Sequence, residues 1–318
     1  MDALTTSGLT KRYGHREPPI HRPGHRPAGE IRALEDLTIA VREGEIFGFL
    51  GPNGAGKSTT IRLLLGYLHP TTGSAVVLGR DIVRDSVEIR RRVGYLPGGI
   101  ALYDSLTGER LLDYLGDLTG RPPVRRADLC DRLELSARTL DRPVRDYSRG
   151  MRQKIGIVQA LQHDPELAIM DEPSEGLDPL MQRAFYDVLD GLKAAGRTVF
   201  FSSHVLSEVE RVCDRVAVVR AGRLVAVEDV DTLLARRRRR VELRLTGPAP
   251  DLRAVPGVSE VAIVGDTMTC ALSGDPRPLL AVIATAPVAD VLIEAARLED
   301  AFLELYQGPD VDSAGPAS

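Results

Sequence analysis

Nine residues near the start of the chain constrain its fold more than any other stretch. They read Gly51-Pro52-Asn53-Gly54-Ala55-Gly56-Lys57-Ser58-Thr59. An apolar run, Ile46–Leu50, comes directly before them, and Thr60–Leu68 carries apolar residues at helical spacing directly after them. Two glycines that are separated by four residues and followed by Lys and Ser, between a buried strand and a helix, predict a phosphate-binding loop.

The chemistry of this loop follows from its residue types. Glycines let the backbone bend so that successive N–H groups point at phosphate oxygens. The partly positive end of the following helix faces the same anion. Lys57 would supply charge to the β- and γ-phosphates, and the Ser58 hydroxyl would ligate Mg²⁺. The alternative is a plain glycine-rich turn before a helix, which the strand, the Lys-Ser pair and the helix in register disfavour.

Two further apolar runs end in polar residues. Leu167–Met170 is followed by Asp171 and Glu172, and Thr198–Ser203 is followed by His204. Apolar strands that alternate with helical segments predict a parallel sheet covered on both faces. Ligands of such sheets lie at the carboxyl ends of the strands. We therefore expect the phosphate loop and both polar ends to meet at one edge of the sheet.

Each of these polar residues has a chemical role that its type allows. Asp171 is suited to holding Mg²⁺, usually through water, opposite Ser58. Glu172 is suited to polarising a water toward the γ-phosphate, and His204 to bonding the γ-phosphate or orienting Glu172. The alternatives are a solvated strand end for the carboxylates and a structural histidine.

Five motifs in this order carry a family resemblance. They are the phosphate loop, Tyr147–Gln153, Met170–Pro173, Gly176–Asp178 and Ser203–His204. Over residues 1 to about 228 the chain resembles the nucleotide-binding subunit of an ATP-binding-cassette (ABC) transporter. The resemblance implies an α/β fold, a P-loop NTPase ABC cassette with a mixed-sheet core and a helical subdomain. It also implies ATP and Mg²⁺ as ligands and ATP hydrolysis as the reaction.

The resemblance extends the site beyond the phosphate loop, whose residues Gly51 to Thr59 would all serve nucleotide binding. Tyr13 is similar to the family's aromatic residue that stacks on adenine. Ser148 and Gly150 match signature positions that contact the γ-phosphate held by a second subunit, and Asp178 matches a loop that acts across the dimer. The implied assembly is a head-to-tail dimer of two copies with two ATP molecules between them, which drives separate transmembrane permease subunits.

Two departures from the family pattern need stating. The signature, usually Leu-Ser-Gly-Gly-Gln, reads Tyr-Ser-Arg-Gly-Met here, and it keeps Ser148 and Gly150. Gly98 stands where the family places a Gln that contacts Mg²⁺ and the membrane partner, which puts that ligand and that coupling contact in doubt. The same replacement, with Ala101–Tyr103 and Leu106–Gly108 after it, resembles the daunorubicin and doxorubicin resistance subgroup of bacterial exporters.

The rest of the chain divides at changes of composition. We expect an ABC domain over residues 1–228, a linker over 229–240, a small α+β domain over 241–308 and a disordered tail over 309–318. Leu4–Tyr13 is typical of an edge strand, and the Pro-rich stretch His15–Pro27 of a surface loop. Five arginines, Arg236–Arg240, are expected at a solvated helix end. Leu298–Leu305 resembles the closing helix of the subgroup's small domain.

Composition limits where the protein works. The net charge of −4 favours neither nucleic acid nor an anionic membrane, and no apolar run approaches the roughly 20 residues that span a bilayer. The three cysteines, far apart, are expected as small core residues. We therefore expect a cytoplasmic protein whose membrane role passes through a partner. The resemblance implies that it is peripheral on the membrane through its permease and that it powers export of a drug, antibiotic or lipid-like molecule. The alternatives are a soluble ABC ATPase acting on ribosomes or nucleic acid, which the arginine run favours, and an importer ATPase.

Overall fold

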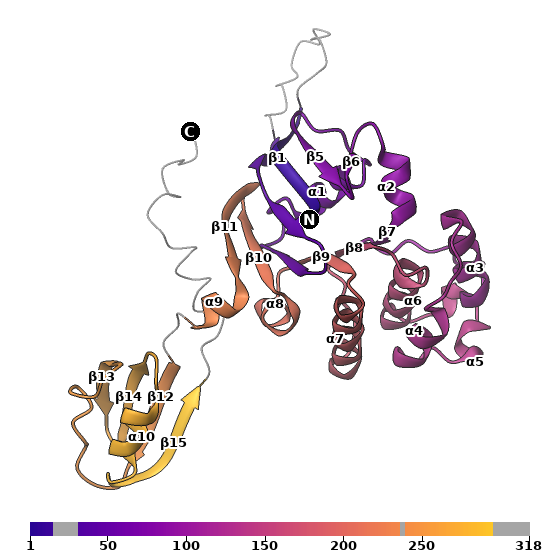
Figure 1. The fold of residues 1–318 in the computed structure, drawn as a ribbon. Coiled ribbons are helices and arrows are strands. Elements are labelled where there is room, and N and C mark those ends of the chain that lie inside the picture. Colours follow the sequence, from indigo (N-terminus) through magenta and orange to yellow (C-terminus); the bar gives the residue numbers. More distant parts are fainter. Residues whose placement is uncertain (15–30, 236–238, 295–318) are drawn as a thin grey trace, which may run out of the picture. The chain divides into compact units, whose positions relative to one another are not determined.

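A computed structural model of the chain describes residues 1–14, 31–235 and 239–294, which form two compact units (Figure 1). One unit is Met1–Glu228 and the other is Asp229–Ser318. Four sequence features lie wholly or partly outside the described residues. They are the stretch His15–Pro27, residues 236–238 of the arginine run, the segment Leu298–Leu305 and the tail.

The first unit is built on a six-stranded sheet in the order β11-β10-β4-β9-β8-β7. The five strands from β10 to β7 are parallel to their neighbours. Every residue of β4, β8 and β9 is buried, as expected for the middle of a parallel sheet. The strands are β4 (Ile46–Leu50), β7 (Val93–Leu96), β8 (Leu167–Asp171), β9 (Thr198–Ser203), β10 (Arg215–Arg220) and β11 (Arg223–Asp229).

A second sheet, with antiparallel pairing, lies over one face of the first. Its strands are β1 (Asp2–Tyr13), β2 (Ile31–Leu37), β3 (Ala40–Arg42), β5 (Thr72–Val77) and β6 (Arg80–Asp81). β1 pairs with β2 and β3 along one side and with β5 along the other, so the expectation of an edge strand is wrong. β1 is twelve residues long, and its register shifts near Gly8, whose φ is +57°. The length and the shifts allow this one strand to pair with three others.

One core joins the two sheets around helix α1 (Lys57–Leu64). It contains Leu4 and Val77 from the antiparallel sheet, Phe49 and Phe200 from the parallel sheet, and Ile61 from α1. The helix begins at Lys57 and ends at Leu64, so the expected span Thr60–Leu68 is displaced toward the C-terminus. The left-handed Gly56 starts the helix inside the phosphate loop, and Gly66, at φ +67°, turns the chain soon after it ends.

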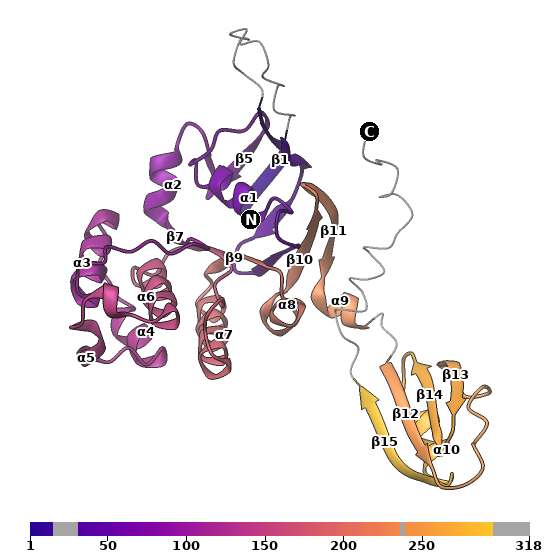
Figure 2. The ribbon, with the colours of Figure 1, turned by 180° about the vertical axis from the view of Figure 1, so that it is seen from behind.

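Helices cover the other face of the parallel sheet and extend into a helical block (Figure 2). Helices α7 (Pro179–Ala194) and α8 (Leu206–Val212) pack against β9 and β4. The block itself consists of α3 (Gly108–Thr119), α4 (Arg126–Arg132), α5 (Ala137–Leu140) and α6 (Arg149–Leu161), and α2 (Ser86–Arg92) precedes it beside β7. Helix α6 connects this block to β7 of the sheet.

The second unit is a four-stranded antiparallel sheet with one helix packed on it. The strand order is β13-β14-β12-β15, and α10 (Arg277–Ile283) adds Leu279 to a core with Val241 and Leu243. The strands are β12 (Arg239–Leu245), β13 (Val258–Val264), β14 (Thr267–Leu272) and β15 (Val288–Glu294), preceded by α9 (Val230–Ala235).

The end of the arginine run lies in this sheet. Arg239 and Arg240 begin β12 instead of ending a helix, so that expectation is wrong for these two residues. The physical reason is alternation, since β12 buries Val241 and Leu243 and leaves Arg240 and Arg244 exposed on the other face.

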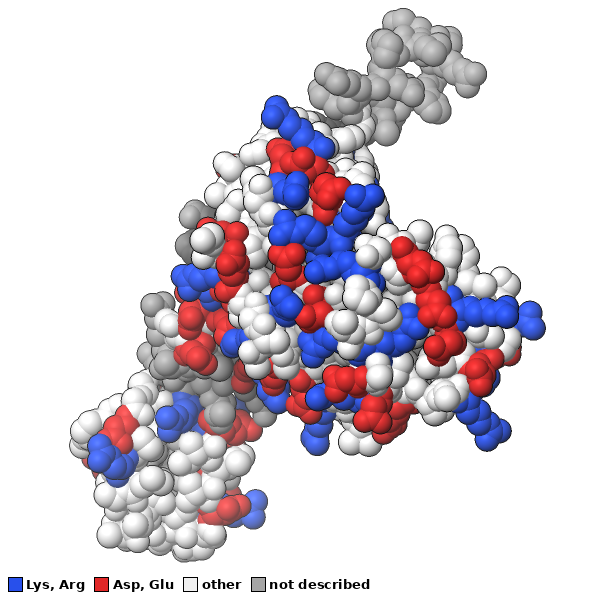
Figure 3. All heavy atoms as spheres, turned by 45° about the vertical axis from the view of Figure 1, so that its right-hand side comes forward, with Lys and Arg blue, Asp and Glu red and all other residues white. Residues whose placement is uncertain are grey.

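The surface of the described residues mixes both signs of charge. Lys and Arg side chains lie among Asp and Glu over the face shown in Figure 3. The cysteines Cys130, Cys213 and Cys270 are buried free thiols, as expected of core residues. No helix among the described residues is long and apolar enough to cross a membrane.

Candidate functional site

The phosphate loop leaves the carboxyl end of β4 and enters α1. Gly54 and Gly56 have φ values of +82° and +102°, which favour glycine. Gly51 and Gly56 also lie against backbone, because a Cβ on Gly51 would be 2.4 Å from the Val219 carbonyl oxygen and one on Gly56 would be 2.5 Å from that of Ala33. The tight course of the loop therefore depends on residues without side chains.

Lys57 is buried within this loop, with 6% of its surface exposed. Its Nζ donates hydrogen bonds to the carbonyl oxygens of Gly51 at 2.6 Å and Pro52 at 3.3 Å. The same nitrogen lies 3.1 Å from Oε1 of Glu172. A buried cation is thus held at the mouth of the loop by two carbonyls and one carboxylate.

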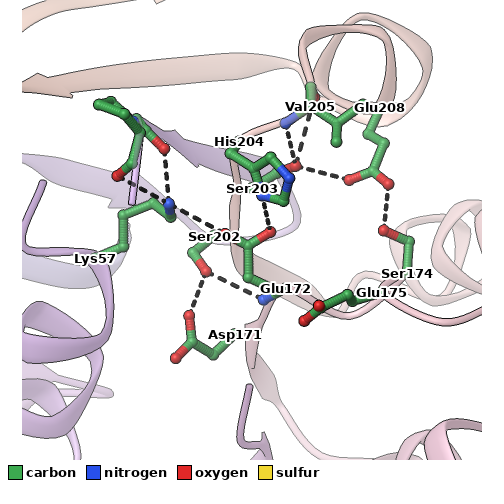
Figure 4. A network of polar contacts seen from close by, with 12 residues as sticks. Lys57, Asp171, Glu172, Ser174, Glu175, Ser202, Ser203, His204, Val205 and Glu208 are labelled. Atoms are coloured by element: carbon green, nitrogen blue, oxygen red, sulfur yellow. Dashed lines mark hydrogen bonds and ion pairs between the residues drawn. The ribbon is translucent and has the colours of Figure 1, made fainter. Parts of the chain in front are cut away.

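Glu172 connects this lysine to the end of β9 (Figure 4). Its Oε2 lies 2.8 Å from Nδ1 of His204, and its backbone N–H donates to the hydroxyl and carbonyl oxygens of Ser202, both at 3.2 Å. The result is a continuous chain from Lys57 through Glu172 to His204, which joins the carboxyl ends of three neighbouring parallel strands.

Asp171 turns its two carboxylate oxygens to different neighbours. Oδ1 accepts a hydrogen bond from the Ser202 hydroxyl at 2.6 Å. Oδ2 faces Gly98, where a Cβ would lie 3.1 Å from it. Burial, with the Asp171 carboxylate as the next cause, raises the pKa of Tyr95 to about 12, so this phenol stays protonated near Asp171.

These groups line a cavity of about 470 Å³. Its walls come from the phosphate loop, the start of β2, the segment after β7 and the end of β8. The lining residues are Ile31, Arg32, Ala33, Asn53, Gly54, Gly56, Lys57, Ser58, Thr59, Arg62, Tyr95, Pro97, Gly98, Gly99, Asp171 and Glu172. Three loop residues, Gly51, Pro52 and Ala55, are not among them, and His204 reaches the cavity only through Glu172.

The donor set suits a hard divalent cation that is shared with substrate oxygens. Ser58 and Asp171 line the same cavity and offer a hydroxyl and a carboxylate, the oxygen ligands that Mg²⁺ takes. In the described part of the chain, no group of three or more His, Cys, Asp or Glu side chains could hold a metal. The residues therefore fit a Mg²⁺ ion that also binds phosphate oxygens and water.

Four further predicted site residues, besides Gly51, Pro52, Ala55 and His204, lie outside the cavity lining. Tyr13, 38% exposed, pairs in register with the cavity residue Ile31, and Lys11 Nζ lies 5.3 Å from the centre of its ring. Ser148 and Asp178 are exposed and cap α6 and α7, where Ser148 accepts from Met151 N at 3.2 Å. Gly150 lies in the first turn of α6, and a Cβ there would be 3.0 Å from the Gly176 carbonyl oxygen. The roles of these four residues stay predictions.

Sequence reasoning missed the polar groups behind the site. Ser202 holds both Asp171 and the Glu172 backbone, while Ser203 donates to Glu208 on α8. Two serines that end an otherwise apolar strand were a detectable signal, because a fully buried strand contains few hydroxyls without a function. Glu208, four residues after His204, had no such signal, since an acidic residue on a short helix is usually solvated.

Comparison with known proteins gives a consistent match to one family. Residues 34–175 match the family model described as ABC transporter. An uncharacterized ABC transporter ATP-binding protein of Synechocystis sp. is 42% identical over 65% of this chain but only 59% of its own length. The Nod factor export ATP-binding protein I of Ralstonia nicotianae is 34% identical over 95% of this chain and 93% of its own.

Two further similarities concern the subgroup and the fold. The daunorubicin resistance ATP-binding protein DrrA3 of Streptomyces coeruleorubidus is 36% identical over 73% of this chain and 70% of its own. A solved structure, described as the ATP binding subunit of an ABC transporter, is 31% identical, superposes with a TM-score of 0.64 and covers 73% of this chain and 91% of its own.

Proposed function

Because this chain belongs to the ATP-binding proteins of ABC transporters, we propose that it binds and hydrolyses ATP to power an exporter through a separate membrane subunit. The family and the cassette fold that the five motifs predicted are confirmed. The observation that carries the proposal is the continuous chain Lys57–Glu172–His204 at the mouth of the phosphate loop. It places a cation, a carboxylate and an imidazole at one edge of the sheet.

Each of these groups has a part in the proposed hydrolysis. The loop N–H groups and Lys57 bind the β- and γ-phosphates and balance charge on the phosphate oxygens. Glu172 orients and polarises the attacking water, and His204, 2.8 Å away, fixes the direction of that carboxylate. Ser58 and Asp171 would hold Mg²⁺, which supplies charge neutralisation between the β- and γ-phosphates when bound.

A second copy of the chain is proposed to complete the site. Ser148 and Gly150 lie at the N-terminal end of α6, and Asp178 precedes α7, all at positions outside the cavity of their own chain. An exposed hydroxyl and backbone N–H groups at the start of a thirteen-residue helix suit contact with a γ-phosphate held by the partner. The assembly is then a head-to-tail dimer with two ATP molecules between the copies.

Export is the direction that the relatives favour. The relative that aligns over nearly the whole chain is named for Nod factor export, and another for daunorubicin resistance. We propose a drug, an antibiotic or a lipid-like molecule as the transported substrate. The protein would then lie on the cytoplasmic face of the membrane, bound to its permease.

The Glu172→Gln variant tests this proposal. It keeps the size of the side chain but cannot polarise water, so ATP turnover should fall about 10²–10⁴-fold while ATP stays bound. Turnover, bound nucleotide and dimer formation are measured on the purified chain with ATP and Mg²⁺. Turnover near the parent rate would show that Glu172 is not the general base, and a parent that binds no ATP would overturn the function itself.

A further inference from the structure

A buried carboxylate lies directly behind the contact between Glu172 and His204. Glu208, on α8, is only 5% exposed. Its Oε2 accepts a hydrogen bond from the Ser203 hydroxyl at 2.7 Å, and its Oε1 accepts one from the Ser174 hydroxyl (Figure 4). Within residues 1–14, 31–235 and 239–294, no cationic side chain forms an ion pair with Glu208. A buried carboxylate without a cation depends on such hydrogen bonds.

The two serines belong to the segments that carry the proposed catalytic groups. Ser203 directly precedes His204, and Ser174 follows Glu172 by two residues. β8 and β9 are parallel neighbours, so both segments leave the sheet at the same edge. One carboxylate, supplied by a third element, therefore ties the two segments together.

The backbone of Glu172 shows why such a tie matters. Its φ of +50° lies in the left-handed region, which residues other than glycine rarely adopt. A conformation of this kind persists only where the surroundings fix the chain on both sides. Ser202 bonds the backbone N–H of Glu172 on one side. On the other side Ser174, with only Pro173 between, is bonded to Glu208.

We propose that Glu208 is a positioning residue for ATP hydrolysis, which acts through Ser174 and Ser203 to hold Glu172 and His204 together. The inference rests on the proposed function. Glu208 is not among the residues that line the cavity, so it acts on the attacking water only through its neighbours. The Ser203 hydroxyl also accepts from the Val205 N–H at 2.9 Å, which fixes the turn from His204 into α8.

A third hydroxyl supplies a matched control. Burial, and then the nearby Glu208 carboxylate, raise the pKa of the Tyr186 phenol. Tyr186 lies on α7, outside the two segments that carry Glu172 and His204. The Tyr186→Phe variant removes a contact to the same carboxylate without loosening either segment, whereas Ser174→Ala loosens the segment of Glu172.

The test compares ATP turnover and ATP affinity of the full chain and its variants. Because misplacement of about 1 Å can cost up to about 100-fold in rate, Ser174→Ala should lower kcat about tenfold and Glu208→Ala about 30-fold. KM and ATP affinity should stay within about twofold, Tyr186→Phe should stay near the parent rate, and Ser174→Thr should recover most of it. In a Glu172→Gln chain, Ser174→Ala should have no further effect, since its action passes through Glu172.

The outcomes separate this inference from the proposed function. If the parent hydrolyses ATP but Ser174→Ala does so equally fast, or Tyr186→Phe falls with it, Glu208 is only a structural residue. Parallel loss of ATP affinity would overturn the inference in the same way. A parent that neither binds nor hydrolyses ATP overturns the function and the positioning role together. If Glu208→Ala does not fold, the Ser174→Ala and Ser174→Thr variants still test the inference.

Discussion

The phosphate-loop side of the site and the signature side differ in how far one chain builds them. On the phosphate-loop side, Lys57 and Asp171 are buried, and each contacts polar groups from a different strand end. On the signature side, Ser148 and Asp178 are exposed, and among the described residues their side chains bond backbone N–H groups of their own helices. A single copy therefore assembles the polar groups of the phosphate-loop side by itself, and we propose that its exposed caps meet a second copy.

Removing the lysine is the strongest way to test the first side. Lys57→Ala takes away the ammonium that lies 2.6 Å from the Gly51 carbonyl and 3.1 Å from Glu172. Charge-assisted contacts to phosphate are strong, so ATP affinity should fall by about 100-fold or more. Equilibrium binding of ATP measures this, with the exposed Lys193→Ala as the control. Unchanged affinity would show that Lys57 does not bind phosphate.

A second test concerns the two ends of α6, which differ in exposure. Ser148 caps its exposed start. His163 follows the other end, is 5% exposed, and neither ring nitrogen has a hydrogen-bond partner among the described residues. Burial, and then the neighbouring Arg121, lower the pKa of His163 to about 4 from 6.5. The folded state therefore binds the proton less well than the unfolded state, and stability present above pH 6.5 is lost as the pH falls toward 4.

The expected loss is about 2 kcal/mol of unfolding free energy at pH 5 relative to neutral pH. Urea unfolding between pH 4.5 and 7.5 measures it. His163→Met keeps an adaptable apolar side chain at this position and should remove this component of the pH dependence. The same profile in the variant would assign the acid sensitivity to other groups.

Replacing Ser148 tests the second side directly. Ser148→Ala should lower turnover about tenfold at concentrations where two copies meet, because a contact to the partner's γ-phosphate is lost. ATP affinity of the dilute chain should change less than twofold, since Ser148 is not in the cavity of its own chain. Ser136→Ala is the matched control, because Ser136 caps α5 in the same way. Equal loss of turnover in both variants would mean that the loss comes from the missing helix cap and not from a contact to the partner's γ-phosphate.

The sequence predicted the phosphate-loop side of the site, because its residues stand at the ends of continuous apolar stretches. β4, β8 and β9 are buried strands followed by the phosphate loop, Glu172 and His204, and parallel pairing brings those ends together. The pattern therefore predicted that the phosphate loop and the polar ends of the other two strands would meet at one edge of the sheet. The role of Ser148, contact with a γ-phosphate held by a second subunit, came from the resemblance alone.

What the sequence did not predict depends on contacts between distant residues. The interior place of β1 requires pairing with β5, some 70 positions away, which no local pattern of β1 reveals. The bond between Ser174 and Glu208 spans 34 residues and depends on how α8 packs beside the sheet. The strand position of Arg239 and Arg240 depends on their pairing with Leu272 and Ala271 of β14.

Gly98 gives the smallest expected effect and the sharpest test of the metal side. A Cβ at this position would lie 3.1 Å from Asp171 Oδ2, so any side chain presses on the carboxylate proposed to hold Mg²⁺. Gly98→Ala adds that pressure alone, and the apparent Mg²⁺ affinity for ATP turnover should fall a few-fold. Gly98→Gln adds the same pressure and an amide oxygen, a ligand type that Mg²⁺ accepts, so it should recover part of the loss.

Gly99→Ala is the matched control, because a Cβ at Gly99 meets nothing within 4 Å in the structure. The measurement is the Mg²⁺ dependence of ATP turnover at saturating ATP in the parent and the three variants. If Gly98→Ala and Gly98→Gln both behave as Gly99→Ala does, Asp171 does not hold the metal near Gly98. If only Gly98→Gln changes the rate, the amide acts on the water or the partner, and the cavity wall at Gly98 belongs to coupling instead of metal binding.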